Sequence, residues 1–418
     1  MDSIFPNGEL INRERLAARH AAMARIGATG RGGVQRLALS SDDTAARLQL
    51  VDWASARGFA AAVDPIGNLF IRRKGRHSDT LPVVTGSHLD SQPTGGNYDG
   101  VFGVLAAFEA LESLEDRGIA TRRPIDLVVW TNEEGARFAP TTMGSGVFAR
   151  ALSLESILAT SDAEGVTVAQ ALEGAMAALA HATVLEQRPL GAPAFAYVEA
   201  HIEQGPILEA NNTAIGIVTG IQGLRQFEVT VRGRVGHAGT TPLHRRRDAL
   251  VAARQILDVV ERSFPDDEDL RFTVGRMDVR PGVVNTIPGE VVFTIDLRHP
   301  EVRVIETISD SIEAACRSAA APCVATARLV LDSSPTEFDP ALIARITDAC
   351  DRLGFTRRTM TSGATHDAKH MAALCPTGMI FIPCRDGISH SESESAELGH
   401  IVAGADVLAD VVLGLAEK

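Results

Sequence analysis

The chain of 418 residues is long for a single hydrophobic core, and its 45% apolar and 22% charged residues are typical of a globular enzyme with two domains. Its net charge of −13 argues against nucleic acid as a partner, because phosphate binding requires a basic face. A polar N-terminus, five cysteines without a CxxC pair, and the lack of an apolar stretch of roughly 18 residues predict a cytoplasmic protein with no membrane partner.

The first part of the chain alternates helical and strand patterns. Helical spacing covers 8–26, 40–57 and 101–118, and the last of these ends at a glycine. Short apolar runs typical of buried strands occupy 81–87, 124–131, 194–200 and 377–383. This alternation predicts an α/β fold, a mostly parallel sheet with flanking helices. The alanine-rich segment 153–192 is partly helical, and no function follows from it.

The pattern changes between residues 213 and 331. Long alternating runs such as LRQFEVTVRG and EVVFTIDLRH are typical of strands, and helical patterns cover 242–263 and 301–319. We therefore predict an inserted α+β domain over 213–331, with a discontinuous domain formed by 1–212 and 332–418.

Five potential metal ligands each lie where a strand pattern ends. They are His88, Asp99, Glu134, His201 and His390. In open α/β sheets the carboxyl ends of the strands meet at one edge, so the fold would gather these side chains. Three imidazoles and two carboxylates can hold two divalent cations if one carboxylate bridges them, and such a site produces hydroxide from water at neutral pH.

Each of these residues also has an ordinary alternative when it is taken alone. A histidine after a strand is commonly a hydrogen-bonded loop residue, the pair Glu133–Glu134 could be solvated charge, and Asp99 before a glycine is a typical turn or helix cap. Their shared position at strand ends argues against coincidence, and Glu133 becomes a spare carboxylate that could move a proton. We expect Asp90 to orient the imidazole of His88, although it could also be a turn carboxylate. The pattern therefore predicts a metal-dependent hydrolase.

A series of motifs runs through nearly the whole chain. In order they are GSHLDSQPTGGNYDG, TNEEGARF, HIEQGP, GRVGHAGTTP, RRDAL, VNTIPGEV, IDLRH, SGATHDA and IPCRDGISHS. Together they resemble the M20 metallohydrolases, and most closely the amidase, hydantoinase/carbamoylase branch. That branch contains N-carbamoyl-L-amino acid hydrolases, β-ureidopropionases of the bacterial and yeast type, and allantoate amidohydrolases.

The resemblance implies a role for each ligand. Two metal ions would be held by His88 with His201 and by Glu134 with His390, bridged by Asp99. Glu133 would be the general base that takes a proton from the attacking water and later protonates the leaving nitrogen. Histidine with carboxylate suits zinc or manganese, and cobalt or nickel would also fit.

The inserted domain resembles the family's dimerisation or lid domain, which implies a homodimer. His237 would polarise the scissile carbonyl, commonly in the site of the neighbouring subunit, and Asn285 with Arg298 would hold the substrate's carboxylate. Taken alone, His237 could be a polar turn residue and Arg298 a surface arginine at a strand end.

The larger domain would supply the remaining substrate contacts. The resemblance assigns these contacts to Gln204 and to the backbone of Gly363 and Ala364. Thr365 stands where many relatives have glycine, and a β-branched residue there would narrow or re-aim the loop. The shape of the substrate pocket is therefore expected to differ from that of relatives.

The function implied is hydrolysis of the linear ureido C–N bond of an N-carbamoyl-L-amino acid, giving the amino acid, carbon dioxide and ammonia. The substrate would be a small carboxylated ureido compound with an undetermined side chain. Allantoate amidohydrolase, with the same chemistry on two ureido groups, is the alternative. An M20 aminopeptidase or aminoacylase is disfavoured because His201 stands where many peptidases carry aspartate. A catalytically inactive binding protein is disfavoured because all five ligands and Glu133 are present.

Overall fold

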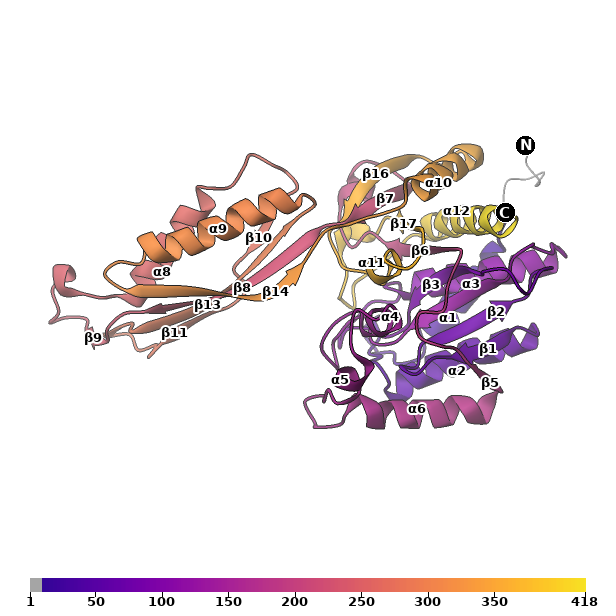
Figure 1. Cartoon of the computed structure of the whole chain (residues 1–418), viewed down its shortest axis with the longest axis horizontal. Helices are drawn as coiled ribbons and strands as arrows, with labels where there is room; N and C mark the ends of the chain where they lie inside the picture. The colour runs from indigo at the N-terminus through magenta and orange to yellow at the C-terminus, as the bar shows by residue number, and fades with distance from the viewer. Residues whose placement is uncertain (1–9) are drawn as a thin grey trace. The chain divides into compact units, whose positions relative to one another are not determined.

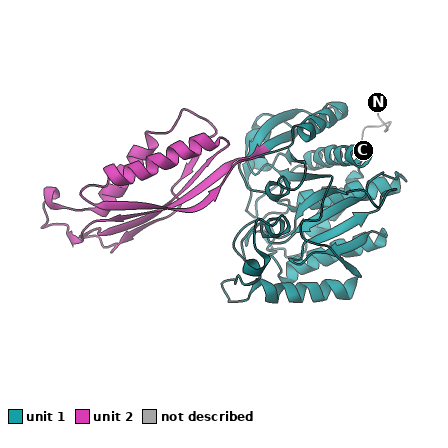
Figure 2. Cartoon of the chain, in the orientation of Figure 1, with its two compact units in different colours: residues 1–219, 337–418 teal, residues 220–336 magenta. Residues whose placement is uncertain are grey.

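The computed structural model describes residues 10–418. The chain forms two compact units, which Figure 2 colours separately. The larger unit comprises Met1–Thr219 and Glu337–Lys418, and the inserted unit comprises Gly220–Thr336.

The observed boundaries differ from the predicted insertion over 213–331. The strand β7 (Ile215–Ile221) pairs antiparallel with β17 (Thr377–Ile382), so the residues just after 213 extend the sheet of the larger unit. The sequence pattern over 213–331 places these residues in the insertion. The prediction was wrong at this point because an alternating strand does not reveal which sheet it joins.

The larger unit is built on a ten-stranded sheet in the order β15-β7-β17-β6-β3-β4-β2-β1-β5, with β16 also paired to β7 (Figure 1). The remaining strands are β1 (Ala60–Val63), β2 (Leu69–Arg73), β3 (Val83–His88), β4 (Ile125–Trp130), β5 (Leu185–Gln187), β6 (Ala196–Ile202), β15 (Thr336–Glu337) and β16 (Arg357–Ser362). The four predicted strands are β3, β4, β6 and β17, which are parallel neighbours at the centre of the sheet. The expected α/β fold with a mostly parallel central sheet is therefore confirmed.

Helices flank this sheet. They are α1 (Arg13–Met23), α2 (Ser41–Ala56), α3 (Val101–Asp116), α4 (Met143–Phe148), α5 (Leu154–Leu158), α6 (Val168–Ala182), α7 (Ile207–Ala210), α10 (Pro340–Leu353), α11 (Ala368–Met371), α12 (Leu398–Ala416) and the 3₁₀ turn η2 (Arg385–Gly387). The helix predicted over 8–26 is α1, which begins after the capping residue Asn12, and residues 8 and 9 lie outside the described part of the chain. Within the described residues, α12 alone is long and apolar enough to cross a membrane, but 72% of it is buried inside the protein, where it packs on α3 and β6 as a core helix.

The inserted unit has its own antiparallel sheet and core. Its elements are β8 (Gly223–Arg232), β9 (Gly236–His237), η1 (Leu243–Arg245), α8 (Ala249–Glu261), β10 (Arg271–Thr273), β11 (Met277–Arg280), β12 (Thr286–Ile287), β13 (Glu290–His299), α9 (Val302–Ser318) and β14 (Val324–Ser333). The sheet runs β10-β13-β8-β14, with β11 also on β13, and α8 and α9 lie together on one side of it (Figure 1). The helix predicted over 242–263 begins only at Ala249, because Asp248 caps it and a 3₁₀ turn precedes it.

The inserted unit also has a separate ribbon and an exposed edge strand. The short strands β9 and β12 form a separate ribbon in which His237 is opposite Thr286. Strand β14 contains no buried residue. It carries four exposed large apolar side chains, which are Val324, Leu329, Val330 and Leu331. This edge strand therefore presents apolar surface to the outside.

Candidate metal centre

The five predicted ligands are brought together at the carboxyl edge of the larger unit's sheet. His88 is the last residue of β3, and His201 is the last but one of β6. Glu134 follows β4, and Asp99 precedes α3. Because β4, β3 and β6 are adjacent and parallel, their ends deliver these side chains to one place. The fifth ligand, His390, lies in the loop after β17 and η2 and is half exposed, whereas the other four are buried.

Asp99 lies between two groups of ligand atoms. Its Oδ1 is 3.1 Å from Nε2 of His201 and 3.7 Å from Nε2 of His88. Its Oδ2 is 3.3 Å from Nε2 of His390, which is in turn 3.4 Å from Oε2 of Glu134. The geometry thus forms two clusters, His88–Asp99–His201 and Asp99–Glu134–His390, that share one carboxylate. A carboxylate with one oxygen in each cluster is the arrangement that a bridging ligand requires.

The two buried histidines are held so that Nε2 faces the site. Nδ1 of His88 is 2.9 Å from the carbonyl oxygen of Asp90, and Nδ1 of His201 is 2.9 Å from the carbonyl oxygen of Ile202. A carbonyl oxygen can only accept, so each Nδ1 carries the proton and each Nε2 keeps its lone pair. Nε2 of His88 is buried without a hydrogen-bond partner. An unpartnered buried nitrogen costs about 1–3 kcal/mol, and a bound cation would remove that cost, so the residues present fit a metal ion.

The pKa values of the site also fit a bound cation. Burial alone would raise the pKa of Asp99, but the nearby imidazoles of His201, His390 and His88 hold it well below its usual range. The hydrogen bond to Asp99 raises the pKa of His390 to about 9, and burial, aided by Asp99, raises the pKa of Glu134 to about 7. The raised pKa values of Glu134 and His390 reflect a surplus of buried carboxylate charge at the site. A divalent cation would neutralise that charge.

Glu133 lies beside the ligands but belongs to neither cluster. Its Oε2 is 3.5 Å from Nε2 of His88. Burial, reinforced by neighbouring carboxylates, raises the pKa of Glu133 well above its usual value in spite of His88. A carboxyl group with a raised pKa, held next to the ligand atoms, is suited to accept and return a proton.

Asp90 supports the site through different atoms than we predicted. Its backbone carbonyl, and not its carboxylate, orients the imidazole of His88, because the nearer carboxylate oxygen lies 3.8 Å from Nδ1. The carboxylate instead accepts the backbone N–H groups of Glu133 and Glu134, each at 3.2 Å. One residue therefore connects the ligand on β3 with the glutamate pair after β4.

Polar side chains that the sequence did not single out complete the surroundings. The amide of Gln92 donates to Oε2 of Glu134 at 2.8 Å, and the hydroxyl of Ser389 donates to Oδ2 of Asp99 at 2.9 Å. Gln204, expected at the substrate, donates its amide to Oδ2 of Asp99 at 2.7 Å. Its backbone is left-handed, with φ of 57°. In this state Gln204 thus helps to fix the shared carboxylate.

The loop that contains Gly363 and Ala364 lies beside His201. It joins β16 to α11, and the imidazole of His366 within it is buried, with its ring centre 4.4 Å from that of His201. Nε2 of His366 is 3.1 Å from the hydroxyl of Ser362, which ties the loop to the end of β16. Contacts from this loop to a substrate stay a prediction.

The residues predicted in the inserted unit fall into two places. His237 and Asn285 are neighbours on the β9–β12 ribbon, where the backbone N–H of Ala238 donates to the carbonyl of Asn285 at 3.0 Å. The N–H of Gly239 donates to Nδ1 of His237 at 3.0 Å, so in the neutral ring the proton is on Nε2. His237 is exposed and thus offers Nε2–H as a hydrogen-bond donor.

Arg298 lies at the other end of the same unit. It faces Leu224 near the start of β8, whereas the opposite end of β13, at Glu290, faces Arg232, shortly before the ribbon. Eight residues of extended strand separate these ends by roughly 27 Å. The Nε of Arg298 donates to Oδ1 of Asp296 at 2.7 Å, and its Nη2 donates to Oδ2 at 3.3 Å. The expected carboxylate anchor therefore already holds a carboxylate.

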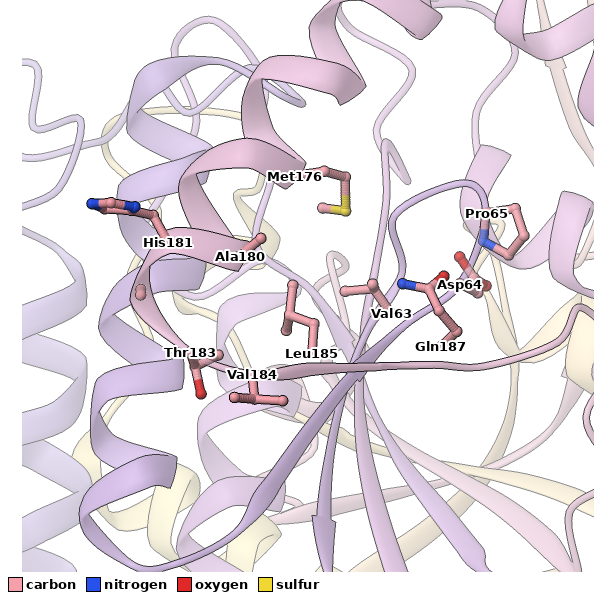
Figure 3. A pocket seen from close by; sticks show the side chains of 11 residues that line it. Val63, Asp64, Pro65, Met176, Ala180, His181, Thr183, Val184, Leu185 and Gln187 are labelled. Atoms are coloured by element: carbon pink, nitrogen blue, oxygen red, sulfur yellow. The ribbon is translucent and has the colours of Figure 1, made fainter.

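One groove of the larger unit offers no comparable chemistry. It is a groove of about 610 Å³ beside β1, β5 and the end of α6 (Figure 3). Its lining includes Met176, Val184 and Leu185, with Asp64 as the one carboxylate. That carboxylate already accepts the N–H groups of Ile66 and Asn68 and the amide of Asn68. His181 is the one imidazole of the lining, so the groove does not gather the several ligands that a metal ion requires.

Comparison with known proteins points to one family. The model of peptidase family M20/M25/M40 matches residues 75–414. An N-carbamoyl-L-amino-acid amidohydrolase of Rhizobium meliloti is 40% identical over 413 residues, which cover 97% of each chain. An allantoate amidohydrolase of Escherichia coli (strain K12) is 34% identical and covers 94% of this chain and 96% of its own. The crystal structure of an amidase of the hydantoinase/carbamoylase family from Burkholderia multivorans superimposes with a TM-score of 0.91 and 44% identity, covering 99% of this chain and 100% of that chain.

Proposed function

The chain belongs to peptidase family M20/M25/M40, whose members are metal-dependent hydrolases, and we propose that it cleaves the linear ureido C–N bond of an N-carbamoyl-L-amino acid. The observation that carries the proposal is the position of Asp99, which turns one carboxylate oxygen toward each of two ligand clusters. The 40% identity with a named N-carbamoyl-L-amino-acid amidohydrolase over nearly the whole chain supports the choice of substrate.

Two divalent ions per subunit would occupy these clusters. His88 and His201 would hold one ion, Glu134 and His390 the other, and Asp99 would bridge them. Mixed imidazole and carboxylate ligands favour zinc or manganese, and accept cobalt or nickel. Bound there, the ions would supply Lewis-acid polarisation and lower the pKa of water toward neutrality.

The protein's own groups would handle the proton. Glu133 takes a proton from the attacking water and returns it to the amino-acid nitrogen as the C–N bond breaks. This releases the free amino acid and a carbamate, and the carbamate decomposes to carbon dioxide and ammonia. Nε2–H of His237 donates a hydrogen bond to the carbonyl oxygen as negative charge develops, a type of contact that contributes roughly 3–4 kcal/mol in other hydrolases. Arg298 and Asn285 hold the substrate's carboxylate, and Gln204 with the backbone of Gly363 and Ala364 positions the polar remainder.

We propose that the protein works as a homodimer. Arg298 and the strand end that leads to His237 lie roughly 27 Å apart in one inserted unit, too far for one small substrate to contact both ends. Arg298 lies at the end of the sheet where the chain enters the unit, and His237 at the far end. A complete site would then combine Arg298 of one chain with His237 and Asn285 of the other. The exposed apolar side chains of β14 suit an interface between copies.

A substrate panel with defined metal content tests the proposal. Protein stripped with a chelator and then supplied with zinc, manganese, cobalt or nickel is assayed on N-carbamoyl-L-α-amino acids, N-carbamoyl-β-alanine, allantoate and dipeptides. We expect ammonia release that depends on added metal, with the highest kcat/KM for an N-carbamoyl-L-α-amino acid. Turnover of dipeptides alone, or full activity in stripped protein, would contradict the proposal.

Allantoate is the second candidate substrate. The 34% identity with a named allantoate amidohydrolase over 94% of the chain favours it specifically. The chemistry and the roles of Glu133 and His237 would be the same, since allantoate also has a linear ureido group and a carboxylate. A higher kcat/KM for allantoate than for every carbamoyl amino acid would select this candidate.

A further inference from the structure

One buried carboxylate beside the ligands has no part in the function proposed above. Glu394 is 4% exposed and uses both oxygens as acceptors. Its Oε1 accepts the backbone N–H of Tyr98 at 2.8 Å and that of Asp99 at 3.2 Å. Its Oε2 and Oδ2 of Asp99 both face the one proton of the Ser389 hydroxyl, at 3.1 Å and 2.9 Å from its oxygen. These contacts span almost 300 residues of sequence, so Glu394 joins two loops that are distant in the chain.

The contacts of Glu394 converge on Asp99. The backbone N–H of Asp99 is bound directly, and Oδ2 of Asp99 is 2.9 Å from the same Ser389 hydroxyl that Glu394 holds. Glu394 therefore fixes the backbone of Asp99 directly and its side chain through Ser389. Gly96 shows how closely the loop packs here, because a Cβ at Gly96 would lie 2.1 Å from Oε1 of Glu394.

A neighbouring glutamate provides a contrast. Glu392 lies two residues earlier in the same loop, and its carboxylate pairs with Arg31, whose side chain is 74% exposed. Glu392 has no hydrogen bond to Asp99 among the contacts of the described residues. The presence of several glutamates in this loop therefore does not explain the contact with Asp99, since only Glu394 turns inward to that shared carboxylate.

We infer that Glu394 is a positioning residue that sets the orientation of Asp99 between the two ligand clusters and ties it to the loop of Ser389 and His390. The inference rests on the proposed function, in which Asp99 bridges two ions. A bridging carboxylate must present one oxygen to each cluster, and a rotation about its side-chain bonds would lose one of them. Glu394 prevents this rotation by holding the backbone and, through Ser389, Oδ2.

Metal affinity measured against a chromogenic chelator tests the inference independently of turnover. Glu394→Gln keeps the size of the side chain but replaces one acceptor oxygen with a donor. We expect a loss of roughly 10- to 100-fold in affinity for zinc, the range seen when groups that orient metal ligands are removed. The visible spectrum of the cobalt-loaded protein should also change, because the ligand geometry changes. The matched control Glu392→Gln should stay within about twofold of the parent protein.

A second variant tests the inference even if Glu394→Gln does not fold. Gly96→Ala displaces the carboxylate of Glu394 without altering any polar group, and we expect it to weaken zinc binding in the same direction. Parent affinity and an unchanged cobalt spectrum in Glu394→Gln, or in Gly96→Ala if the former does not fold, would overturn the inference alone. A parent protein that binds no divalent ion would overturn the proposed function together with it.

Discussion

At the residue scale, the predicted ligands could be identified from the sequence, whereas the residues that hydrogen-bond to them could not. His88 and His201 could be predicted because each ends an apolar run. Glu394 could not, since the segment SESESAE contains three glutamates in a similar local pattern, and only the fold turns one of them inward. Gln92 was missed for a related reason, because an amide in a polar loop has no local signature. Hydrogen bonds between distant loops depend on tertiary structure that spacing does not encode.

The proposed base gives a direct prediction. Glu133→Gln removes the group that accepts the proton but keeps the shape of the side chain, so we expect kcat to fall roughly 10²- to 10⁴-fold. Metal content and KM should change little, since Glu133 belongs to neither ligand cluster. Steady-state kinetics with metal analysis of the same sample checks both expectations. Turnover at the parent rate would show that another group moves the proton.

The buried His20 predicts a pH dependence of the protein's stability. Burial lowers the pKa of His20 from 6.5 to about 4, and both ring nitrogens lack hydrogen-bond partners. Because the folded pKa lies below the unfolded one, the stabilising contribution is present above pH 6.5 and is lost as the pH falls toward 4. The loss at pH 5 should be about 2 kcal/mol.

Urea unfolding at pH 5 and pH 7.5 measures this loss. The variant His20→Phe keeps an aromatic ring beside Tyr98 and Phe102 but cannot take up a proton. We expect the difference in unfolding free energy between the two pH values to be smaller in the variant by about that amount. Equal differences in parent and variant would exclude His20 as the origin.

At the scale of elements, the central strands were predictable and their partners were not. Strands β3, β4, β6 and β17 are buried along their whole length, and each includes a short apolar stretch that marks it in the sequence. Strand β7 was assigned to the wrong unit, because its sequence fits either sheet and only the pairing with β17 decides. Sequence patterns thus predict which segments are strands more reliably than which strands are neighbours.

The close packing of α3 on β6 leads to a prediction about the site. A Cβ at Gly103 would lie 2.2 Å from the carbonyl oxygen of Ala200, so the helix that follows Asp99 touches the strand that carries His201. We expect Gly103→Ala to lower the free energy of unfolding by roughly 1–3 kcal/mol and to weaken metal binding, because the helix must move away.

The control for this prediction is another helical glycine. Gly174 in α6 has open space where a Cβ would be. Gly174→Ala should therefore raise the unfolding free energy by up to about 1 kcal/mol through helix propensity and leave metal affinity unchanged. Thermal unfolding and chelator competition on both variants make the comparison. If Gly103→Ala behaved like Gly174→Ala, the packing argument would be wrong.

At the scale of the whole molecule, two subunits are predicted to share each site. We expect His237→Ala and Arg298→Ala to be nearly inactive as pure proteins, and a refolded one-to-one mixture to recover up to about a quarter of the parent activity. Half of the dimers would be mixed, and one of the two sites in each would have both residues intact. Assays of the mixture and of the separate variants decide the matter. No recovery, with mixed dimers present, would mean that both residues act from one chain.

The pairing of Arg298 with Asp296 bears on how tightly a substrate can be held. A ligand carboxylate that reaches this guanidinium would exchange with one already in place, so little new Coulomb energy is gained. Exchange of this kind favours quick release of an amino-acid product that carries the same carboxylate. Asp296 would then compete with the product for Arg298 and so limit product inhibition. Replacement of Asp296 by asparagine should lower the inhibition constant of the product amino acid.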